Sequence, residues 1–221
     1  MQIFFLFNFF KIMNLSEALK NKIYGITSRK HAPHGDVFQQ VKNMIDQGVK
    51  IIQYRDKDVS DSEFFQIAQK LKKIIPKEIL FIINDRWQIA GELKISAVHL
   101  GQEDLLNLPG QSKKMAVLRH YLKKKTNLAE VIIGISTHSW EEAFQAEQIG
   151  GDYIGVGALY FTSSKDNVAV IKKHEVSKIL QNIKIPKVAI GGINFNNYQE
   201  FLKKGFDSVA MMSALSDTKP L

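Results

Sequence analysis

Residues 37–75 read VFQQVKNMIDQGVKIIQYRDKDVSDSEFFQIAQKLKKII, and the spacing of their apolar positions changes twice along that stretch. Residues 37–47 repeat apolar side chains at helical spacing, and Gly48 ends this helix because glycine readily adopts positive φ. Residues 51–54 form a short apolar strand, and residues 60–75 begin with a Ser-x-x-Glu capping box followed by a second apolar stripe. The stretch therefore predicts a helix, a buried strand and another helix in succession.

The same alternation continues along the whole chain, whose 221 residues suit one domain. We predict further strands at residues 23–27, 80–83, 97–100, 131–135, 153–156, 188–190 and 208–211. We predict the other helices at residues 86–92, 113–123, 139–149, 175–181 and 196–204. Apolar strands separated in this way by helices favour an α/β fold of the closed (β/α)₈ or TIM barrel type over an open doubly wound sheet.

The two ends of the chain depart from this pattern. Residues 1–12, MQIFFLFNFFKI, are apolar but too short to span a bilayer, and they lack the layout of a signal peptide. We interpret them as a non-native extension ahead of a functional start at Met13, with the barrel domain at residues 13–221. The alternative is an extra apolar segment that packs on the barrel or on a partner. Residues 213–221 leave room for a short last helix or none. The closing seam would then be covered by the segment around residues 15–20, by a partner, or poorly.

Composition excludes some kinds of site. Cysteine is absent, which excludes disulfides, iron–sulfur clusters and thiolate zinc sites, and is compatible with the cytoplasm, where we expect the protein. The formal net charge is +8, but the lysines are scattered, so we interpret them as a solvated surface and expect no binding of nucleic acid. The histidines form no metal-binding pattern. We expect His99 to be a hydrogen-bonded strand residue and His138 to lie near the substrate.

Polar clusters follow four of the predicted strands, at residues 53–57, 84–85, 101–104 and 162–165. In a barrel the carboxyl ends of the strands form one face, so these clusters should meet there. Together they offer two separated aspartates, several cations, hydroxyl groups and glycine turns. This combination is typical of a site for a metal-bound phosphate substrate.

Asp85 and Asp104 are the candidate metal ligands. Magnesium takes oxygen ligands and keeps several waters, so two carboxylates with phosphate oxygens are enough to hold it. Either aspartate alone could simply cap a helix or a turn. The pair at successive strand ends predicts a metal site.

Arg55 and Lys57 alternate at the exit of their strand, so both should face one side while Tyr54 and Asp56 face the other. The alternative is a surface salt bridge between these cations and a neighbouring aspartate. Gln53 argues for a polar site, because a neutral amide among apolar residues needs a buried partner.

Residues 189–194 combine a strand end, a Gly-Gly turn and a helix start. Backbone N–H groups there can hold a phosphate with help from the helix dipole, and residues 212–213 can supply more donors. A purely structural glycine turn is the alternative. Lys165 lies in a loop rich in hydroxyl groups and is either a phosphate ligand or a mobile surface lysine.

Taken in order, seven short motifs resemble the thiamine phosphate synthase family over residues 23–215. They are Gln53-x-Arg55-x-Lys57, Ile83-Asn84-Asp85-Arg86, and the motifs at residues 99–104, 134–138, 152–157, 189–193 and 209–213. The resemblance implies a (β/α)₈ transferase that joins hydroxymethylpyrimidine diphosphate to hydroxyethylthiazole phosphate, releases pyrophosphate and requires Mg²⁺. Its partners would be small phosphorylated substrates, without nucleic acid or membrane, and a homo-oligomer stays open.

By position, the resemblance also implies roles for individual residues. Asp85 and Asp104 would bind the metal. The pyrimidine diphosphate would be held by Gln53, Arg55, Lys57, Asn84 and Lys165, and Ser136 would lie against the pyrimidine. The thiazole phosphate would be held by Thr162, Ser164, Gly192, Met212 and Ser213. The expected catalytic residues are Lys165, Arg55, Lys57 and Ser136.

Other functions stay open beside the synthase. The related thiazole tautomerases keep the barrel but typically lose the diphosphate and metal residues that this chain keeps. A third possibility is a non-catalytic paralogue that binds a phosphate ligand. His138 bears on this choice because tautomerases use a histidine at this point, although synthases often carry one too. The loop at residues 162–165 reads Thr-Ser-Ser-Lys where synthases usually show Thr-x-Thr-Lys. Because serine keeps the hydroxyl group, we expect this departure to affect efficiency more than reaction class.

Overall fold

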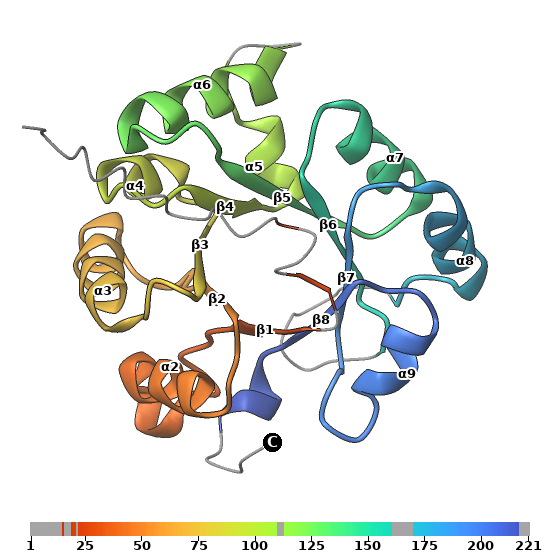
Figure 1. The fold of residues 1–221 in the computed structure, drawn as a ribbon, viewed down its shortest axis with the longest axis horizontal. Helices are drawn as coiled ribbons and strands as arrows, with labels where there is room; N and C mark the ends of the chain where they lie inside the picture. Colours follow the sequence, from red (N-terminus) through yellow and green to blue (C-terminus); the bar gives the residue numbers. More distant parts are fainter. Residues whose placement is uncertain (1–14, 16–18, 21, 110–112, 161–169, 217–221) are drawn as a thin grey trace, which may run out of the picture.

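The computed structural model describes Leu15, Leu19, Lys20 and residues 22–109, 113–160 and 170–216. Within these residues, eight parallel strands close into one barrel in chain order, with β8 paired to β1. The strands are β1 Lys22–Ile26, β2 Ile51–Tyr54, β3 Leu80–Asn84, β4 Ala97–Leu100, β5 Ile132–Thr137, β6 Tyr153–Val156, β7 Lys187–Ile190 and β8 Ser208–Met211. Figure 1 shows the strands as a central ring with the helices outside it. The predicted barrel is confirmed.

Helices connect successive strands. They are α2 Val37–Asp46, α3 Asp61–Ile74, α4 Trp87–Glu92, α5 Gln102–Leu106, α6 Lys114–Thr126, α7 Trp140–Gln148, α8 Lys173–Asn182 and α9 Tyr198–Lys203, with a 3₁₀ turn, η1, at Pro33–Gly35. Ser60 and Ser139 accept hydrogen bonds from backbone N–H groups of the first turns of α3 and α7, as the capping boxes predict. The short helix α5 was not predicted. None of the helices in the described part of the chain is long and apolar enough to cross a bilayer.

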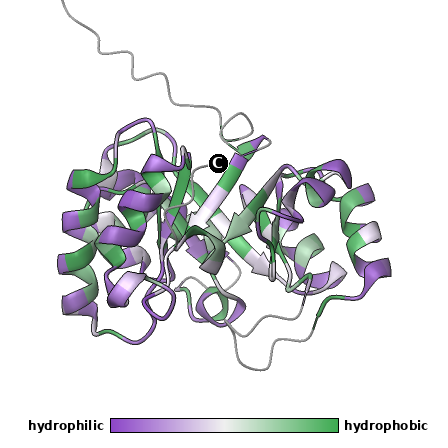
Figure 2. Cartoon of the chain, turned by 90° about the horizontal axis from the view of Figure 1, so that it is seen from below, coloured by the Kyte–Doolittle hydropathy of each residue, from purple (hydrophilic) through white to green (hydrophobic). Residues whose placement is uncertain are grey.

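The apolar core has one layer on each side of the strands. Outward-facing strand residues such as Ile52 pack against apolar helix faces, including that of Phe64 on α3. Inward-facing residues form a smaller cluster that includes Tyr24, Ile51 and Tyr153. Figure 2 shows mainly hydrophobic strands between helices that mix hydrophobic and hydrophilic residues. This arrangement leaves the carboxyl ends of the strands to build a site.

The seam between β8 and β1 is covered by the chain that follows β8. A 3₁₀ turn, η3 Ser213–Leu215, buries Leu215 completely beside the apolar face of α2. The amides of Gln40 and Asn43 on α2 donate to the hydroxyl and carbonyl oxygens of Ser216 at 3.2 and 3.0 Å. Within the described residues, this short segment and its two hydrogen bonds to α2 cover the seam.

Leu19, which precedes β1, lies inside the barrel rather than on the seam. It is fully buried in the inward-facing cluster with Tyr24 and Ile51, and Leu15 packs against the same cluster. Cover of the seam by this segment was one of our expectations, and it is wrong. Leu15 and Leu19 instead belong to the cluster that fills the barrel interior.

Candidate functional site

Two carboxylates meet at the carboxyl ends of β3 and β4. Asp85 follows β3 with a φ of 58°, a left-handed conformation that non-glycine residues adopt where the surroundings enforce it. Its Oδ1 accepts a hydrogen bond from the Gly101 N–H at 3.1 Å. Asp104 lies in the first turn of α5, and a Cβ built on Gly101 would lie 2.9 Å from its Oδ2 and 3.8 Å from Oδ1 of Asp85. The barrel thus brings together two aspartates that are far apart in sequence.

The charge balance at this pair suits a divalent cation. Burial and the neighbouring Asp85 carboxylate raise the pKa of Asp104 from 3.8 to about 6, against the opposing effect of Lys57. Within the described residues, no group of three or more His, Cys, Asp or Glu side chains could hold a metal by itself. Magnesium typically binds through one or two carboxylates together with substrate phosphates. The all-oxygen pair therefore fits magnesium that binds with a phosphate ligand.

Lys57 and Asn84 complete this outer part of the site. The Lys57 ammonium lies 3.5 Å from Oδ2 of Asp85, and Asn84 Nδ2 donates to the same oxygen at 2.5 Å. Asp56, by contrast, turns away and pairs with Arg29 at 2.9 Å. The Lys57 ammonium group thus faces the Asp85 carboxylate, and Asp56 faces the other way, as the alternation at the strand exit predicts.

A second pocket, which we call the inner pocket, occupies the mouth of the barrel. Its lining residues include Tyr24, Gln53, His99, Ser136, His138, Tyr153, Gly192, Met212 and Ser213. None of these nine carries a side chain with a permanent charge at neutral pH. The inner pocket therefore suits an uncharged heterocycle, and an anion bound at its edge would be held by hydrogen-bond donors rather than by a cationic side chain of these nine residues.

A chain of hydrogen bonds crosses the floor of the inner pocket. Gln53 Nε2 donates to the Tyr24 hydroxyl at 2.8 Å, and the Tyr24 and Tyr153 hydroxyls lie 2.9 Å apart. The Tyr153 hydroxyl lies 3.0 Å from Nδ1 of His99, whose Nε2 lies 2.9 Å from the Ser136 hydroxyl. Burial raises the pKa of both tyrosines far above its usual value, so both phenols stay protonated. The chain fixes the Ser136 hydroxyl at the pocket wall.

The outer carboxylates and the inner pocket share a wall. The Asp85 N–H donates to the carbonyl of His99 at 2.8 Å, while the His99 ring belongs to the inner pocket. Gln102, two residues before Asp104 on α5, donates from Nε2 to the Ser136 carbonyl at 2.5 Å. One molecule with a ring and a diphosphate could therefore occupy both parts at once.

The glycine turn after β7 lies on the far side of the inner pocket. Gly191 and Gly192 have φ values of 104° and 67°, which favour glycine, and both line the pocket. Met212 and Ser213, after β8, line it too. The next helix, α9, begins only at Tyr198, later than predicted, so a helix dipole is not part of this turn. Backbone N–H groups are the donors that this corner can offer to a phosphate.

His138 follows β5 and lines the inner pocket. Its backbone N–H donates to Oε2 of Glu142 at 2.7 Å, and its Nδ1 lies 3.1 Å from the same oxygen. This contact fixes the orientation of the ring. His138 thus lies at the inner pocket, and its contact with a substrate stays a prediction.

Most predicted site residues lie in these two parts of the barrel mouth. Arg55 lies at the exit of β2, where its backbone N–H donates to the Thr27 hydroxyl at 2.9 Å. Thr162, Ser164 and Lys165 lie outside the described residues, so their predicted roles stay predictions. His99 is hydrogen-bonded at both ring nitrogens, as expected, although it also lines the inner pocket.

Sequence reasoning missed Tyr24, Tyr153 and Gln102 as individual parts of the site. Tyrosines inside apolar strands look like ordinary core residues. The available signal was Gly134, because β5 pairs it with Tyr153 and a Cβ there would lie 2.1 Å from the Tyr153 ring. A glycine inside a strand often marks such a close approach.

Comparison with known proteins gives one consistent family. The family model described as thiamine monophosphate synthase matches residues 23–215. A thiamine-phosphate synthase of Clostridium acetobutylicum is 37% identical over 195 residues, covering 88% of this chain and 86% of the relative. One of Fusobacterium nucleatum is 37% identical and covers 90% of each chain. The solved thiamine phosphate pyrophosphorylase from Pyrococcus furiosus is 33% identical, with a TM-score of 0.73 over 92% of this chain and 91% of that one.

Proposed function

Because the chain belongs to the thiamine monophosphate synthase family, we propose that it joins hydroxymethylpyrimidine diphosphate to hydroxyethylthiazole phosphate and releases thiamine phosphate and pyrophosphate. The observation that carries this reading is the shared wall between the inner pocket and the Asp85–Asp104 pair. The reaction needs such a pair of neighbouring sites, because its first substrate combines an uncharged ring with a diphosphate. A barrel that kept the ring pocket without the carboxylates would favour isomerisation of a thiazole instead.

Magnesium would be held by Asp85 and Asp104 together with diphosphate oxygens, and when bound it would supply positive charge against the leaving group. Lys57 adds a second positive charge 3.5 Å from Asp85. Asn84 orients Oδ2 of Asp85 through its amide. We assign Arg55 and Lys165 to the same diphosphate on the strength of the family motif.

The proposed reaction requires stabilisation of negative charge on the leaving diphosphate rather than proton transfer. The bond between the pyrimidine methylene carbon and the diphosphate oxygen breaks, and its electron pair leaves with pyrophosphate. The thiazole nitrogen then supplies the electron pair of the new carbon–nitrogen bond. Ser136 and Gln53 would orient the pyrimidine ring in the inner pocket, where the hydrogen-bond chain fixes both side chains. Preorganised groups of this kind each contribute about 10²–10³ in rate.

The thiazole phosphate would lie at the corner formed by Gly192, Met212 and Ser213, with Thr162 and Ser164 adding hydroxyl groups. Support comes from the glycine turn, whose positive φ values favour glycine and whose residues line the inner pocket beside Met212 and Ser213. This corner and the carboxylates lie on different sides of the inner pocket. The two phosphorylated ends would thus stay apart while the ring atoms meet.

One assay tests the proposed function. Both phosphorylated substrates are mixed with the protein and magnesium, and thiamine phosphate and pyrophosphate are measured. We expect equal amounts of the two products, and none after addition of a chelator. Isomerisation of a thiazole phosphate without coupling, or binding without turnover, would contradict the proposal. The substrates are small phosphorylated molecules, and we further propose a cytoplasmic location, supported by the absence of cysteine.

A further inference from the structure

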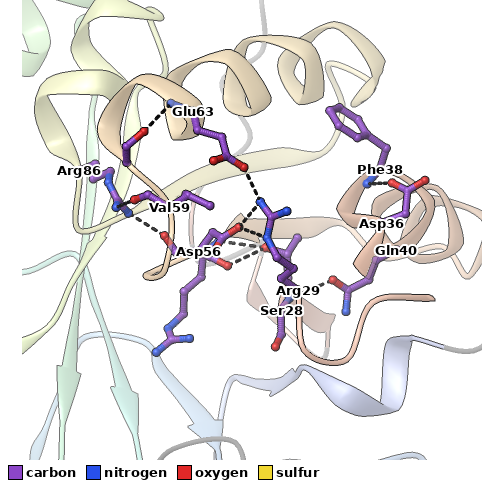
Figure 3. A network of polar contacts seen from close by, with 12 residues as sticks. Ser28, Arg29, Asp36, Phe38, Gln40, Asp56, Val59, Glu63 and Arg86 are labelled. Atoms are coloured by element: carbon purple, nitrogen blue, oxygen red, sulfur yellow. Dashed lines mark hydrogen bonds and ion pairs between the residues drawn. The ribbon is translucent and has the colours of Figure 1, made fainter. Parts of the chain in front are cut away.

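The loop between β2 and α3 carries Lys57, and Arg86 holds this loop in place (Figure 3). Arg86 NH1 donates to the carbonyl of Asp56 at 2.7 Å, and NH2 donates to the carbonyl of Val59 at 2.8 Å. Its Nε donates to Oδ1 of Asp61, at the start of α3, at 2.7 Å. One guanidinium group therefore fixes the backbone on both sides of Lys57.

The opposite flank of the same loop is anchored by residues that follow β1. Arg29 donates from Nε to Oδ2 of Asp56 at 2.9 Å and from NH2 to Glu63 at 3.1 Å (Figure 3). The Asp56 side chain is 2% exposed, whereas the Arg29 side chain is 40% exposed, so the carboxylate is buried and its cationic partner reaches the surface. Thr27 adds a hydrogen bond to the backbone of Arg55 at 2.9 Å. The loop is thus held from both neighbouring strands.

Arg86 directly follows Asp85 in the chain, so one short segment carries the carboxylate and also fixes its cationic partner. We propose that Arg86 is a positioning residue: by holding the backbone around Lys57, it sets the distance between that ammonium group and the Asp85 carboxylate. This inference rests on the proposed function, because it assigns Arg86 a role in binding the diphosphate and none in binding the thiazole phosphate. Lys57 needs such support, since its side chain is 52% exposed and flexible.

Arg86 acts through Lys57 and not as an anion ligand. It lines a pocket beside the outer carboxylates together with Lys57 and Asp104. Three of its five guanidinium N–H groups, one on each nitrogen, already donate hydrogen bonds to the loop after β2 and to Asp61. Its planar group also lies 4.4 Å over the Phe64 ring, which holds the fork in this orientation. These contacts turn the guanidinium group toward the loop that carries Lys57.

Arg119 provides a matched control at the other end of the barrel. Its NH1 donates to the Val131 carbonyl at 2.8 Å, and its NH2 contacts the Gly150 carbonyl at 2.8 Å and Asp152 at 2.9 Å. It therefore makes the same kinds of contact as Arg86, to two backbone carbonyls and one carboxylate. These groups precede β5 and β6, at the amino ends of the strands and away from the site. Arg86→Gln and Arg119→Gln thus remove comparable structural contacts.

The test compares both variants with the wild-type protein in two measurements. Calorimetry follows the binding of pyrophosphate with magnesium, and steady-state assays give a separate KM for each substrate. We expect Arg86→Gln to weaken pyrophosphate binding and to raise the KM of the pyrimidine diphosphate about tenfold or more. The KM of the thiazole phosphate should change less than about twofold, and Arg119→Gln should change neither KM by more than that.

Equal effects of the two variants, or equal increases of both KM values in Arg86→Gln, would overturn the inference. If Arg86→Gln does not fold, Arg86→Lys keeps the charge but cannot fix both carbonyls, and the same selective weakening is expected from it. Wild-type protein that binds pyrophosphate but forms no thiamine phosphate would contradict the proposed function. The calorimetric comparison would still decide the role of Arg86 in that case, because it needs no turnover.

Discussion

Asp85 and Asp104 share the space over Gly101, where a side chain longer than hydrogen would collide with one carboxylate and touch the other. A Cβ at this position would lie 2.9 Å from Oδ2 of Asp104 and 3.8 Å from Oδ1 of Asp85. Gly101 has an ordinary φ of −73°, so its backbone does not require glycine. The residue is therefore explained by the room that the two carboxylates need.

Gly101→Ala should separate metal binding from folding. The added methyl group displaces the Asp104 carboxylate, which is the end of a side chain and can move, so we expect the free energy of unfolding to change by less than about 1 kcal/mol. The magnesium concentration for half-maximal activity should rise about tenfold. Gly155→Ala is the control, because its Cβ would lie 3.4 Å from the His99 ring and away from the carboxylates. Equal magnesium requirements in the two variants would show that the carboxylate pair does not bind the metal.

Asp104→Asn should stabilise the metal-free protein while it abolishes the magnesium-dependent activity. Since the folded-state pKa of Asp104 is raised from 3.8 to about 6, the folded protein binds more protons than the unfolded chain between these values. The free energy of unfolding of the wild type therefore falls as pH rises through this window. The Asp104→Asn variant shows no such fall, because asparagine does not ionise. Discounted for partial exposure, we expect the variant to gain on the order of 1 kcal/mol at pH 8 and nothing near pH 3.

Urea unfolding of the metal-free proteins across this pH range measures that difference. Glu103→Gln is the matched control, because it removes one negative charge from the same turn of α5 at an exposed position. It should show no comparable gain. An Asp104→Asn variant that is less stable than wild type at pH 8, without metal, would contradict the idea of two mutually repelling carboxylates.

The sequence predicts the barrel well because its strands are short, apolar and bounded by capped helices, as residues 37–75 already show. It also predicts the meeting of Asp85 with Asp104, since parallel strands place their carboxyl ends together. It does not predict α5, because five residues are too few for a periodic pattern. The predicted role of Lys165, which lies outside the described residues, rests on the family motif alone.

Contacts between distant segments explain most of what the sequence does not predict. Tyr24 and Tyr153 meet across the barrel interior, and strand register decides that contact, not local pattern. The same holds for Arg86, which lies in a recognisable motif but whose partners belong to the loop after β2. One of our expectations was that the segment around residues 15–20 covers the seam between β8 and β1, but Leu19 packs inside the barrel.

Tyr153→Phe should disturb the inner pocket without affecting the metal site. The change removes the hydroxyl that links Tyr24 to His99 at 2.9 and 3.0 Å, and all three residues are buried. We expect unfolding free energy to fall by about 1–2 kcal/mol and kcat/KM for the pyrimidine diphosphate to fall, with pyrophosphate binding unchanged. Tyr54→Phe is the control, because within the described residues the Tyr54 hydroxyl is buried without a hydrogen-bond partner. If the Tyr54 variant loses as much stability as the Tyr153 variant, the hydrogen-bond chain is not what stabilises the pocket floor.

Leu215→Ala should reveal that η3 closes the barrel. Leu215 is fully buried and belongs to the core layer that includes Met44 of α2 and Val49 before β2. Truncating such a leucine typically costs about 2–5 kcal/mol, which urea unfolding would measure. Leu106→Ala on α5 is the control, since Leu106 is 71% exposed and its loss should cost less than about 0.5 kcal/mol. If both variants were equally stable, η3 would be a loose end of the chain, and the seam between β8 and β1 would have to be held by other contacts.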